Sequence, residues 1–226
     1  MPSANVIQLR QMLSEKFPGL RLRLNGSPAA GRLWPTGLAQ IDEPLSGGLP
    51  KGALTEVVST GKSSGGATLM RALLAQAAVA NQIATLVDSQ DALDVTAMGE
   101  AALSRLLWVR CRTAEEAMKA ADLILRDANL PLLLMDLKMA PPAQLRRIPA
   151  TTWYRFQRLV EETEAIGVVF TPSPMISPAR VRITLPEQFS LRALESDAGQ
   201  LLAELRMETV DLRHGAGTET ALLNTA

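Results

Sequence analysis

The sequence is poor in cysteine, histidine and aromatic residues, and it has no excess of charge of either sign. Its 226 residues include one cysteine, Cys111, and one histidine, His214, which excludes disulfide frameworks and zinc sites built from these two residue types. The 23 basic and 23 acidic side chains cancel. A generally basic nucleic-acid binder is therefore not expected, although a local basic patch is compatible with this balance.

Long apolar runs are also missing. No stretch of 18 or more apolar residues occurs, and charged side chains interrupt the first 20 positions. We therefore expect neither a transmembrane helix nor a secretory signal, and we expect a cytoplasmic protein. Hydrophobic residues nevertheless make up 47% of the chain, which is enough for one sizeable core and excludes disorder over most of its length.

We expect three parts, which are an N-terminal helix and linker in residues 1–35, a core in residues 36–213 and a flexible tail in residues 214–226. In the first part, apolar residues recur at the helical steps of three and four, namely Val6, Leu9, Leu13 and Phe17. This helix packs either on its own core or on a neighbouring subunit, and we favour its own core. Residues 25–37 are rich in glycine and proline and predict a linker.

From residue 53 onwards, short apolar strands alternate with amphipathic helices. The predicted strands are residues 53–58, 83–88, 106–109, 132–136 and 166–171. The predicted helices are residues 67–80, 92–103, 113–127 and 150–165, the third of which opens with a capping box of Thr113 and Glu116. Such alternation is typical of an α/β fold with a mostly parallel sheet flanked by helices. Residues 180–185 and 202–212, with a turn at 197–200, predict antiparallel C-terminal strands.

A glycine-rich segment between the first of these strands and its helix has the spacing of a phosphate-binding P-loop. Such loops follow G-x-x-x-x-G-K-[ST], in which the glycines let the backbone wrap a phosphate, the lysine neutralises it and the hydroxyl ligates magnesium. Gly61, Gly66 and Thr68 fit this spacing, whereas Ala67 stands at the lysine position. Glycine- and serine-rich loops are common, so the spacing also suits an ordinary loop.

Two more side chains are candidates for a degenerate nucleotide site. Lys62, the second residue of the loop, either reaches the phosphate from the other side or is a solvated loop lysine, and a neighbouring subunit is another source of a cation. Asp136, at the end of an apolar strand, either helps to place magnesium or caps a turn. We expect no resident cofactor or metal; ATP with magnesium is the alternative.

The order of these motifs resembles the RecA-type ATPase core. The segments that carry the resemblance are, in chain order, residues 36–42, 47–52, 54–57, 63–69, 87–94 and 132–136. The first three resemble the approach to the RecA P-loop, residues 87–94 resemble the strand and turn that carry its catalytic glutamate, and residues 132–136 resemble its Walker B strand. The resemblance spans residues 36–171 in consistent order and implies a RecA-like P-loop fold.

The sequence departs from this pattern at three places. Ala67 replaces the P-loop lysine. Gln90 replaces the glutamate that activates water, and a neutral amide can orient a water molecule but cannot accept its proton. Residues 172–178, with three prolines, form a short stiff connection where RecA has a long DNA-binding loop. We therefore expect neither a filament-forming recombinase nor a competent ATPase.

A RecA-like core with these departures is similar to the ImuA-type accessory proteins of mutagenic translesion DNA synthesis, a group related to the cell-division inhibitor SulA. Residues 52–56 and 179–185 carry this likeness. It implies a scaffold in the SOS response to DNA damage, with RecA, an ImuB-like Y-family polymerase homologue and an error-prone replicative-type polymerase as partners. It leaves DNA contact weak or indirect and homo-oligomers open.

Two other functions remain open. One is an ATP-binding RecA-like ATPase that uses Lys62, Thr68 and Asp136. The other is a SulA-like inhibitor of the division protein FtsZ, against which the N-terminal extension and the P-loop-like segment argue.

The densest basic region outside the loop surrounds the predicted helix at residues 150–165. It contains Lys138, Arg146, Arg147, Arg155 and Arg158, interleaved with Trp153, Tyr154 and Phe156. Arginines bind phosphates and aromatic rings stack on bases, which favours a contact with DNA or a partner. Three glutamates follow directly, and Trp153, Phe156 and Val160 have the spacing of a buried stripe, so a solvated helix face is the alternative. The predicted contact residues are Arg146, Arg147, Arg155, Arg180 and Arg182.

Overall fold

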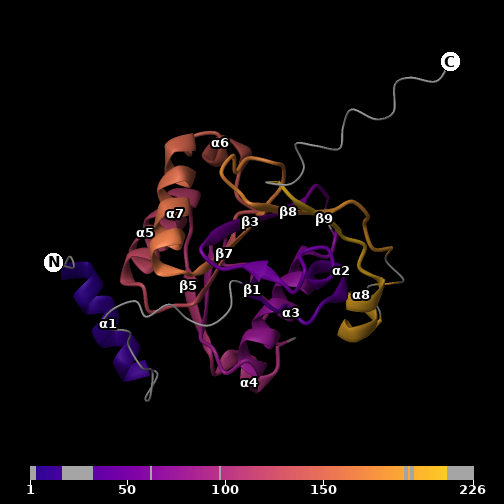
Figure 1. The fold of residues 1–226 in the computed structure, drawn as a ribbon, viewed down its shortest axis with the longest axis horizontal. Helices are drawn as coiled ribbons and strands as arrows, with labels where there is room; N and C mark the ends of the chain where they lie inside the picture. The colour runs from indigo at the N-terminus through magenta and orange to yellow at the C-terminus, as the bar shows by residue number, and fades with distance from the viewer. Residues whose placement is uncertain are drawn as a thin grey trace.

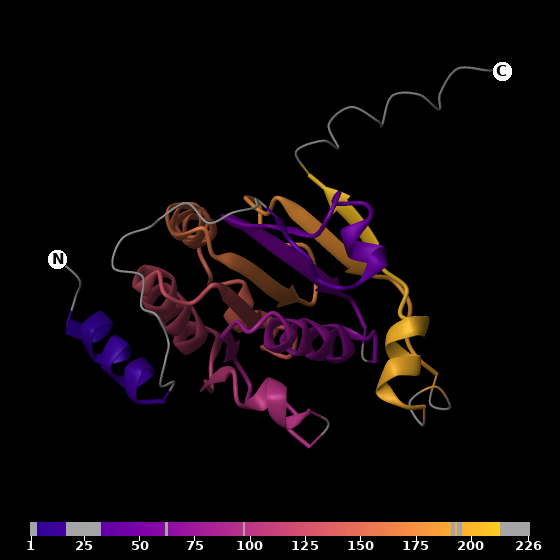
Figure 2. The same cartoon turned by 60° about the horizontal axis from the view of Figure 1, so that its bottom comes forward.

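The computed structural model of the chain describes residues 4–16, 33–61, 63–96, 98–190, 193 and 196–212. Within these ranges, a seven-stranded sheet runs through the molecule, with helices on both of its faces (Figures 1 and 2). None of the helices in the described ranges is both long and apolar enough to cross a membrane.

The sheet is parallel except at one edge. Its strands are, in spatial order, β5 (Leu106–Arg110), β4 (Ala84–Asp88), β6 (Leu132–Asp136), β7 (Ile166–Thr171), β3 (Ala53–Ser59), β8 (Val181–Leu185) and β9 (Glu208–Asp211). Strand β8 is parallel to β3, and only β9, which pairs with β8, is antiparallel. The predicted α/β fold is confirmed, with the antiparallel pairing at the C-terminal end of the chain. All carboxyl ends of the six parallel strands therefore lie at one edge of the sheet.

Two groups of helices cover the two faces. One face carries α1 (Ala4–Lys16), α5 (Ala114–Asp127), α6 (Pro142–Leu145) and α7 (Ala150–Thr163). The other carries α2 (Ala39–Asp42), α3 (Gly66–Val79), α4 (Glu100–Leu103) and α8 (Ala198–Glu204). Because both faces are covered, every residue of β3 and β7 is buried, which explains the mostly apolar sequence of β7 and requires partners for the polar residues of β3.

The predicted buried stripe of the helix at residues 150–165 is confirmed. Trp153, Phe156 and Val160 of α7 are almost fully buried, and the rings of Trp153 and Phe156 meet edge to face. Gln157 on the same face accepts the N–H of Leu54 at 3.0 Å and donates to the carbonyl oxygen of Gly52 at 3.2 Å. Helix α7 is thus joined to the start of β3 by packing and by hydrogen bonds.

Helix α1 packs on the molecule's own core, as expected. Leu9 and Leu13 are buried in the cluster that includes Ala117 and Ala121 of α5, and α1 lies beside α5 in Figure 1. Phe17, the last residue of the predicted stripe, lies outside the described residues, as does the tail at residues 214–226.

Part of the predicted linker at residues 25–37 is instead a strand. β1 (Leu33–Trp34) pairs antiparallel with β2 (Leu49–Pro50), and Trp34 is buried. The carboxylate of Asp42 accepts the N–H groups of Thr36 and Gly37, each at 2.9 Å. These contacts join the segment from residue 33 onwards to the core. A strand of two residues is too short to show an alternating pattern, so the sequence does not reveal the pairing of β1 with β2.

The predicted helix at residues 92–103 is wrong over most of its length. Among the described residues of this range, only α4, residues 100–103, is helical. The buried carboxylate of Asp88 accepts the N–H groups of Ala92 at 2.8 Å and Leu93 at 3.0 Å, and Asp94 accepts the N–H of Thr96 at 2.9 Å. Short acidic side chains bind these amides and so compete with helix formation.

The predicted strand at residues 202–212 is also partly wrong. Residues 198–204 form helix α8, and only β9 is a strand. Asp197, the first residue of the predicted turn, is the N-cap of α8 and accepts the N–H groups of Gly199 at 2.8 Å and Gln200 at 3.0 Å. An aspartate is a typical N-cap and so indicated a helix, but the apolar residues after it fit the spacing of a helix and that of a strand equally well.

Thr113 caps α5 as predicted, because its hydroxyl oxygen accepts the N–H of Glu116 at 3.1 Å. The return bond of the capping box differs, since the Glu116 carboxylate accepts the N–H of Arg112 at 2.8 Å instead of that of the cap residue.

A buried carboxylate joins three segments at the carboxyl edge. Glu56 of β3 is fully buried, and its Oε1 accepts the N–H of Met175 at 2.7 Å, the N–H of Ile176 at 3.1 Å and the hydroxyl of Thr171 at 3.2 Å. Its Oε2 accepts Nε of Arg182 in β8 at 2.9 Å. Glu56 therefore holds the proline-rich connection after β7 against both β3 and β8.

We predict that Arg182→Ala destabilises the protein by about 3–5 kcal/mol, because it leaves the Glu56 charge buried without its cationic partner. Urea unfolding measures this. Lys119→Ala, which removes the exposed pair with Glu115, is the control and should leave stability unchanged. A loss below about 1 kcal/mol for Arg182→Ala would contradict the prediction.

Candidate functional site

The segment between β3 and α3, residues 60–65, which we call the phosphate loop, has the strand–loop–helix context of a P-loop. Its backbone reverses through left-handed conformations at Ser63 (φ 57°) and Gly65 (φ 86°). The buried hydroxyls of Ser59 and Ser64 contact each other, and Ser64 Oγ donates to the carbonyl oxygen of Gly61 at 2.8 Å. In the described part of the chain, no side chain caps α3, so the amides of its first turn face the loop without a cap.

The P-loop spacing singles out three residues at and after this loop, Lys62, Ala67 and Thr68, and the last two have different surroundings. Lys62 lies outside the described residues. Ala67 is exposed on the first turn of α3. Thr68 lines a cavity of about 250 Å³ between α3, α4 and α8, together with Arg71 and Leu202. The Thr68 hydroxyl and the Ala67 methyl group are therefore the two side chains of this motif that the structure places on the first turns of α3.

A lysine from a distant part of the sequence lies at the loop. The Nζ atom of Lys138 is 3.7 Å from the position that a Cβ atom would take on Gly66, and Ser59 Oγ is 3.4 Å from that position. Lys138 is half-buried, and burial lowers the pKa of its ammonium group, while the negative charge of Asp136 acts in the opposite direction. The sequence had grouped Lys138 with the arginines of the α6–α7 region, yet it follows β6 by two residues.

Asp136 ends β6 beside this lysine. Its Oδ1 accepts the backbone N–H of Lys138 at 2.9 Å, and Asp136 pairs in register with Asp88 of β4. Burial raises the pKa of Asp136 to about 6, with a further increase from the charge of Asp88 and opposing contributions from the backbone and ammonium groups of Lys138. Asp136 thus caps the turn after β6 and keeps a carboxyl group at the edge where the loop lies.

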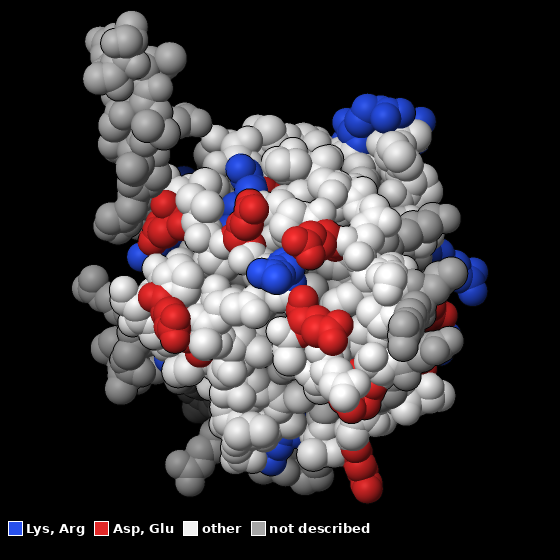
Figure 3. All heavy atoms as spheres, turned by 90° about the vertical axis from the view of Figure 1, so that its right-hand side faces the viewer, with Lys and Arg blue, Asp and Glu red and all other residues white. Residues whose placement is uncertain are grey.

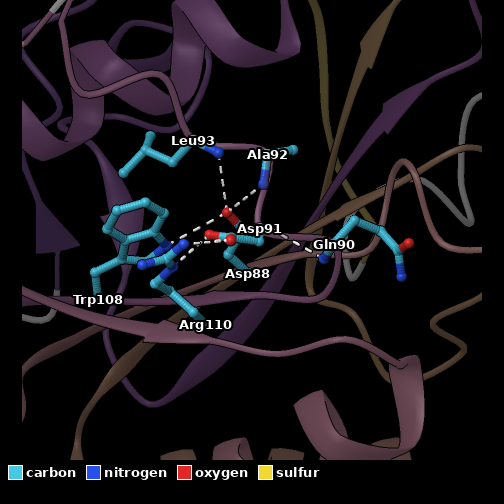
Figure 4. Close-up of polar contacts among 7 residues, drawn as sticks. All are labelled: Asp88, Gln90, Asp91, Ala92, Leu93, Trp108 and Arg110. Atoms are coloured by element: carbon cyan, nitrogen blue, oxygen red, sulfur yellow. Dashed lines mark hydrogen bonds and ion pairs between the residues drawn. The ribbon is translucent and has the colours of Figure 1, made fainter.

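Asp88 organises the turn that follows β4 (Figure 4). Its carboxylate accepts the N–H of Gln90 at 3.2 Å and Nε1 of Trp108 at 3.3 Å, in addition to the amides of Ala92 and Leu93. Sequence reasoning did not single out Asp88. Its signal was an acidic residue at the end of an apolar strand, which is the same signal that identified Asp136.

Gln90, which the resemblance to RecA aligns with the catalytic glutamate, has a side chain directed away from Asp88 (Figure 4). Its Nε2 donates to the carbonyl oxygens of Ser89 at 2.6 Å and Arg112 at 3.5 Å. These bonds use the amide to join the β4 turn to the segment before α5. The side chain therefore has a structural use, and as a neutral amide it cannot accept a proton from water.

The segment after β8 packs against the phosphate loop. The N–H of Phe189 donates to the carbonyl oxygen of Ser63 at 2.9 Å. A Cβ atom on Gly61 would lie 2.2 Å from Gln188 Nε2, and one on Gly65 would lie 2.2 Å from Leu205 Cδ1. A larger residue at Gly61 would have to displace the end of the Gln188 side chain. Glycine is favoured more strongly at Gly65, because its φ is 86° and the buried Leu205 side chain lies against it.

The residues fit a bound phosphate group better than they fit a complete catalytic site. The Lys138 ammonium and the Ser59 hydroxyl lie beside Gly66 at the uncapped start of α3, and ammonium, hydroxyl and backbone amide groups bind phosphate oxygens. ATP would be held there through its phosphates by the loop amides and Lys138. In the part of the chain that the structure describes, no group of three or more His, Cys, Asp or Glu side chains is arranged to hold a metal ion.

The structure divides the five predicted contact arginines into two sets. Arg146 and Arg147 are exposed just after α6, and Arg147 and Arg155 line a cavity of about 490 Å³ between α5, α6 and α7. Arg155 also pairs with Asp122 of α5 at 3.0 Å. Arg180 pairs with Asp211 at 3.6 Å and Arg182 with Glu56, so acidic groups of the protein itself already engage these two.

Charges of both signs are interspersed on the face that lies to the right in Figure 1, as the space-filling view of Figure 3 shows. This agrees with the equal numbers of basic and acidic residues in the sequence. The described residues of that face form no broad surface of one sign that would attract a nucleic acid.

A parallel α/β sheet with a phosphate loop after β3 and an acidic residue at the end of β6 defines a P-loop protein of the RecA-like class. The RecA N-terminal domain family matches residues 28–145, more than half of the chain, and the chain belongs to this family.

Three of its relatives are RecA proteins. Protein RecA of Frankia alni is 34% identical over 105 residues, which cover 45% of this chain and 30% of the relative. Protein RecA of Methylococcus capsulatus is 33% identical over 116 residues, which cover 49% and 33%. Protein RecA of Picosynechococcus is 30% identical over 105 residues, which cover 45% and 30%. The matched region spans about a third of the length of these relatives.

We predict that Asp136→Asn increases the free energy of unfolding more at pH 7 than at pH 4, and that the two increases differ by about 2–2.5 kcal/mol. The pKa of Asp136 in the folded protein is about 6, above the usual 3.8, so the folded state holds this proton more tightly than the unfolded state does. Stability from this group is therefore present below pH 4 and is lost as the pH rises to 6. Urea unfolding of both proteins across this range measures the difference.

Asp91→Asn is the control for this measurement. The hydrogen bond from Arg110 lowers the pKa of the Asp91 carboxyl, so stability from this group is present at neutral pH and is lost on acidification. Its pH dependence should have the opposite sign. An Asp136→Asn protein whose unfolding follows the wild-type pH profile would show that Asp136 does not titrate as described.

Proposed function

We propose that this protein is a non-catalytic, RecA-like accessory or scaffold protein in SOS-induced mutagenic translesion DNA synthesis. It acts through contacts with other proteins, and DNA is at most a weak or indirect ligand. The observation that carries this proposal is a RecA-family core without its catalytic groups, with Ala67 at the lysine position and the Gln90 amide bonded to backbone carbonyls.

The short connection after β7 supports the same proposal. Residues 172–178 stand where RecA has its long DNA-binding loop, and Glu56 binds two backbone amides of this connection. Arg180 and Arg182, the cations that follow it, pair with Asp211 and Glu56. A segment held in this way offers little to a DNA strand, whereas a folded RecA-like core still offers surfaces to proteins.

The proposed partners are RecA, an ImuB-like Y-family polymerase homologue and an error-prone replicative-type polymerase, and self-association is compatible with the same surfaces. We assign the contact to the surface of Arg146, Arg147 and Arg155. Arg146 and Arg147 are exposed, and Arg147 and Arg155 line the cavity between α5 and α7, where Glu115, Lys119 and Asp122 also lie. Mixed charge around a hollow suits a protein partner better than a DNA backbone.

One observation favours the alternative of an ATP-binding protein. Lys138 approaches Gly66, so a cation is present at the phosphate loop although the motif lysine is missing. Binding without hydrolysis is compatible with a scaffold, because the group that activates water is still absent.

We predict that the purified protein, with ATP, magnesium and single-stranded DNA, hydrolyses ATP no faster than a sample without protein. Loss of a general base and of the motif lysine each removes transition-state stabilisation, and about 1.4 kcal/mol corresponds to a factor of ten in rate. Phosphate release measures this, with RecA as the positive control. Hydrolysis at RecA-like rates would refute the non-catalytic function.

We predict that deleting the gene lowers damage-induced mutation frequency without division arrest, and that an Arg146→Ala/Arg147→Ala variant shows the same defect. The matched control is Arg206→Ala, an exposed arginine between α8 and β9. Co-purification from damaged cells should recover the polymerase partner with the control but not with the double variant. Normal mutagenesis in the deletion strain would rule the proposal out.

A further inference from the structure

A P-loop binds phosphate through backbone amides and one cation, and in this chain α3 does not supply the cation. Ala67 ends at a methyl group on an exposed position of the first helical turn. A triphosphate at the loop would then meet the backbone amides of this first turn, which are weaker partners than a charged donor. A cation from another segment would therefore strengthen the binding of such a ligand.

We propose that Lys138, from the turn after β6, takes the place of the missing P-loop lysine and binds the phosphates of a nucleoside triphosphate at the phosphate loop. The ligand class is a polyphosphate chain, which ATP or inorganic tripolyphosphate carries. This inference concerns binding only, and it does not depend on the proposed role in mutagenesis.

The sheet topology brings Lys138 to this place. Strands β3 and β6 are parallel and both flank β7, so the loop after β3 and the turn after β6 emerge at the same edge. Asp136 accepts the backbone N–H of Lys138 at 2.9 Å, which fixes the direction in which the turn leaves the strand. The side chain then extends until its Nζ lies 3.7 Å from the Cβ position of Gly66.

The surroundings of Lys138 leave its ammonium group available to bind an anion. Within the described residues, no side chain or carbonyl oxygen is hydrogen-bonded to Nζ, although the ammonium is half-buried. A half-buried cation without a direct partner is unfavourable for folding alone. The first turn of α3, which has no side-chain cap, faces the same space and presents amide donors.

Gly66 provides a second test of the same geometry. A methyl group there would meet Ser59 Oγ at 3.4 Å and Lys138 Nζ at 3.7 Å, which are ordinary contact distances. Gly66→Ala should therefore fold, and alanine is a better helix residue than glycine. The added methyl group nevertheless occupies the space between the hydroxyl and the ammonium in which a phosphate oxygen would lie.

Calorimetric titration of the full chain tests the proposal with two probes, ATP with magnesium and inorganic tripolyphosphate. We expect both to bind the wild-type protein, Lys138→Ala to weaken each by about 10- to 150-fold, and Lys138→Arg to restore most of the affinity. Gly66→Ala should weaken both probes as well. Tighter binding of ATP than of tripolyphosphate would identify the nucleotide as the source of the phosphates.

Two lysines serve as controls. Lys119→Ala removes an exposed lysine of α5 that pairs with Glu115, and it should bind like the wild type. Lys62→Ala removes the other lysine near the loop sequence, and it should change affinity much less than Lys138→Ala. Thermal unfolding of each variant confirms that lost binding is not lost folding.

Three results would overturn the proposal. In the first, the wild-type protein binds neither probe. In the second, a folded Lys138→Ala protein binds both probes as the wild type does. In the third, Lys62→Ala abolishes binding of the probes whereas Lys138→Ala leaves it unchanged. None of these results bears on the role in mutagenesis, because that role is read from mutation frequency and partner recovery. The two proposals can therefore fail separately.

Discussion

The carboxylate of Glu56 is buried in the middle of the sheet, and donors from three segments reach its two oxygens. An unpaired charge at this depth would be strongly destabilising, so β7, β8 and the connection between them must keep their positions around it. This constraint shapes the carboxyl edge. It holds β8 beside β3, and the chain that leaves β8 therefore packs on the phosphate loop through Gln188 and Phe189.

The parallel order of the strands concentrates the remaining polar chemistry at the same edge. The phosphate loop follows β3, Asp88 ends β4, and Asp136 ends β6 two residues before Lys138. This core of the RecA N-terminal domain family thus gathers the phosphate loop, two carboxyl groups and an ammonium group at one edge of its sheet. The cation next to Gly66 comes from the β6 turn, and the Gln90 amide joins two backbone segments.

Regular local patterns made much of the fold predictable. The central strands and α3, α5 and α7 follow from apolar runs and helical spacing, and Thr113 marked the start of α5. The prediction was wrong where a single side chain overrides the pattern. Asp88 binds the amides of residues 92 and 93 and prevents a helix there, and Asp197 begins a helix where a turn and strand were expected. Strand β1 is too short to leave a periodic signal.

For the site, the sequence by itself determined the loop spacing, the acidic residue after β6 and the absence of a lysine at position 67 and of a glutamate at position 90. These are local facts, because they depend on neighbouring positions. The tertiary structure decided which distant groups meet, such as Glu56 with Arg182, which are 126 residues apart, and Gly66 with Lys138. The physical reason is that residue periodicity reports which face is buried, whereas the contacts of a buried charge or a free cation depend on the order in which the strands pair.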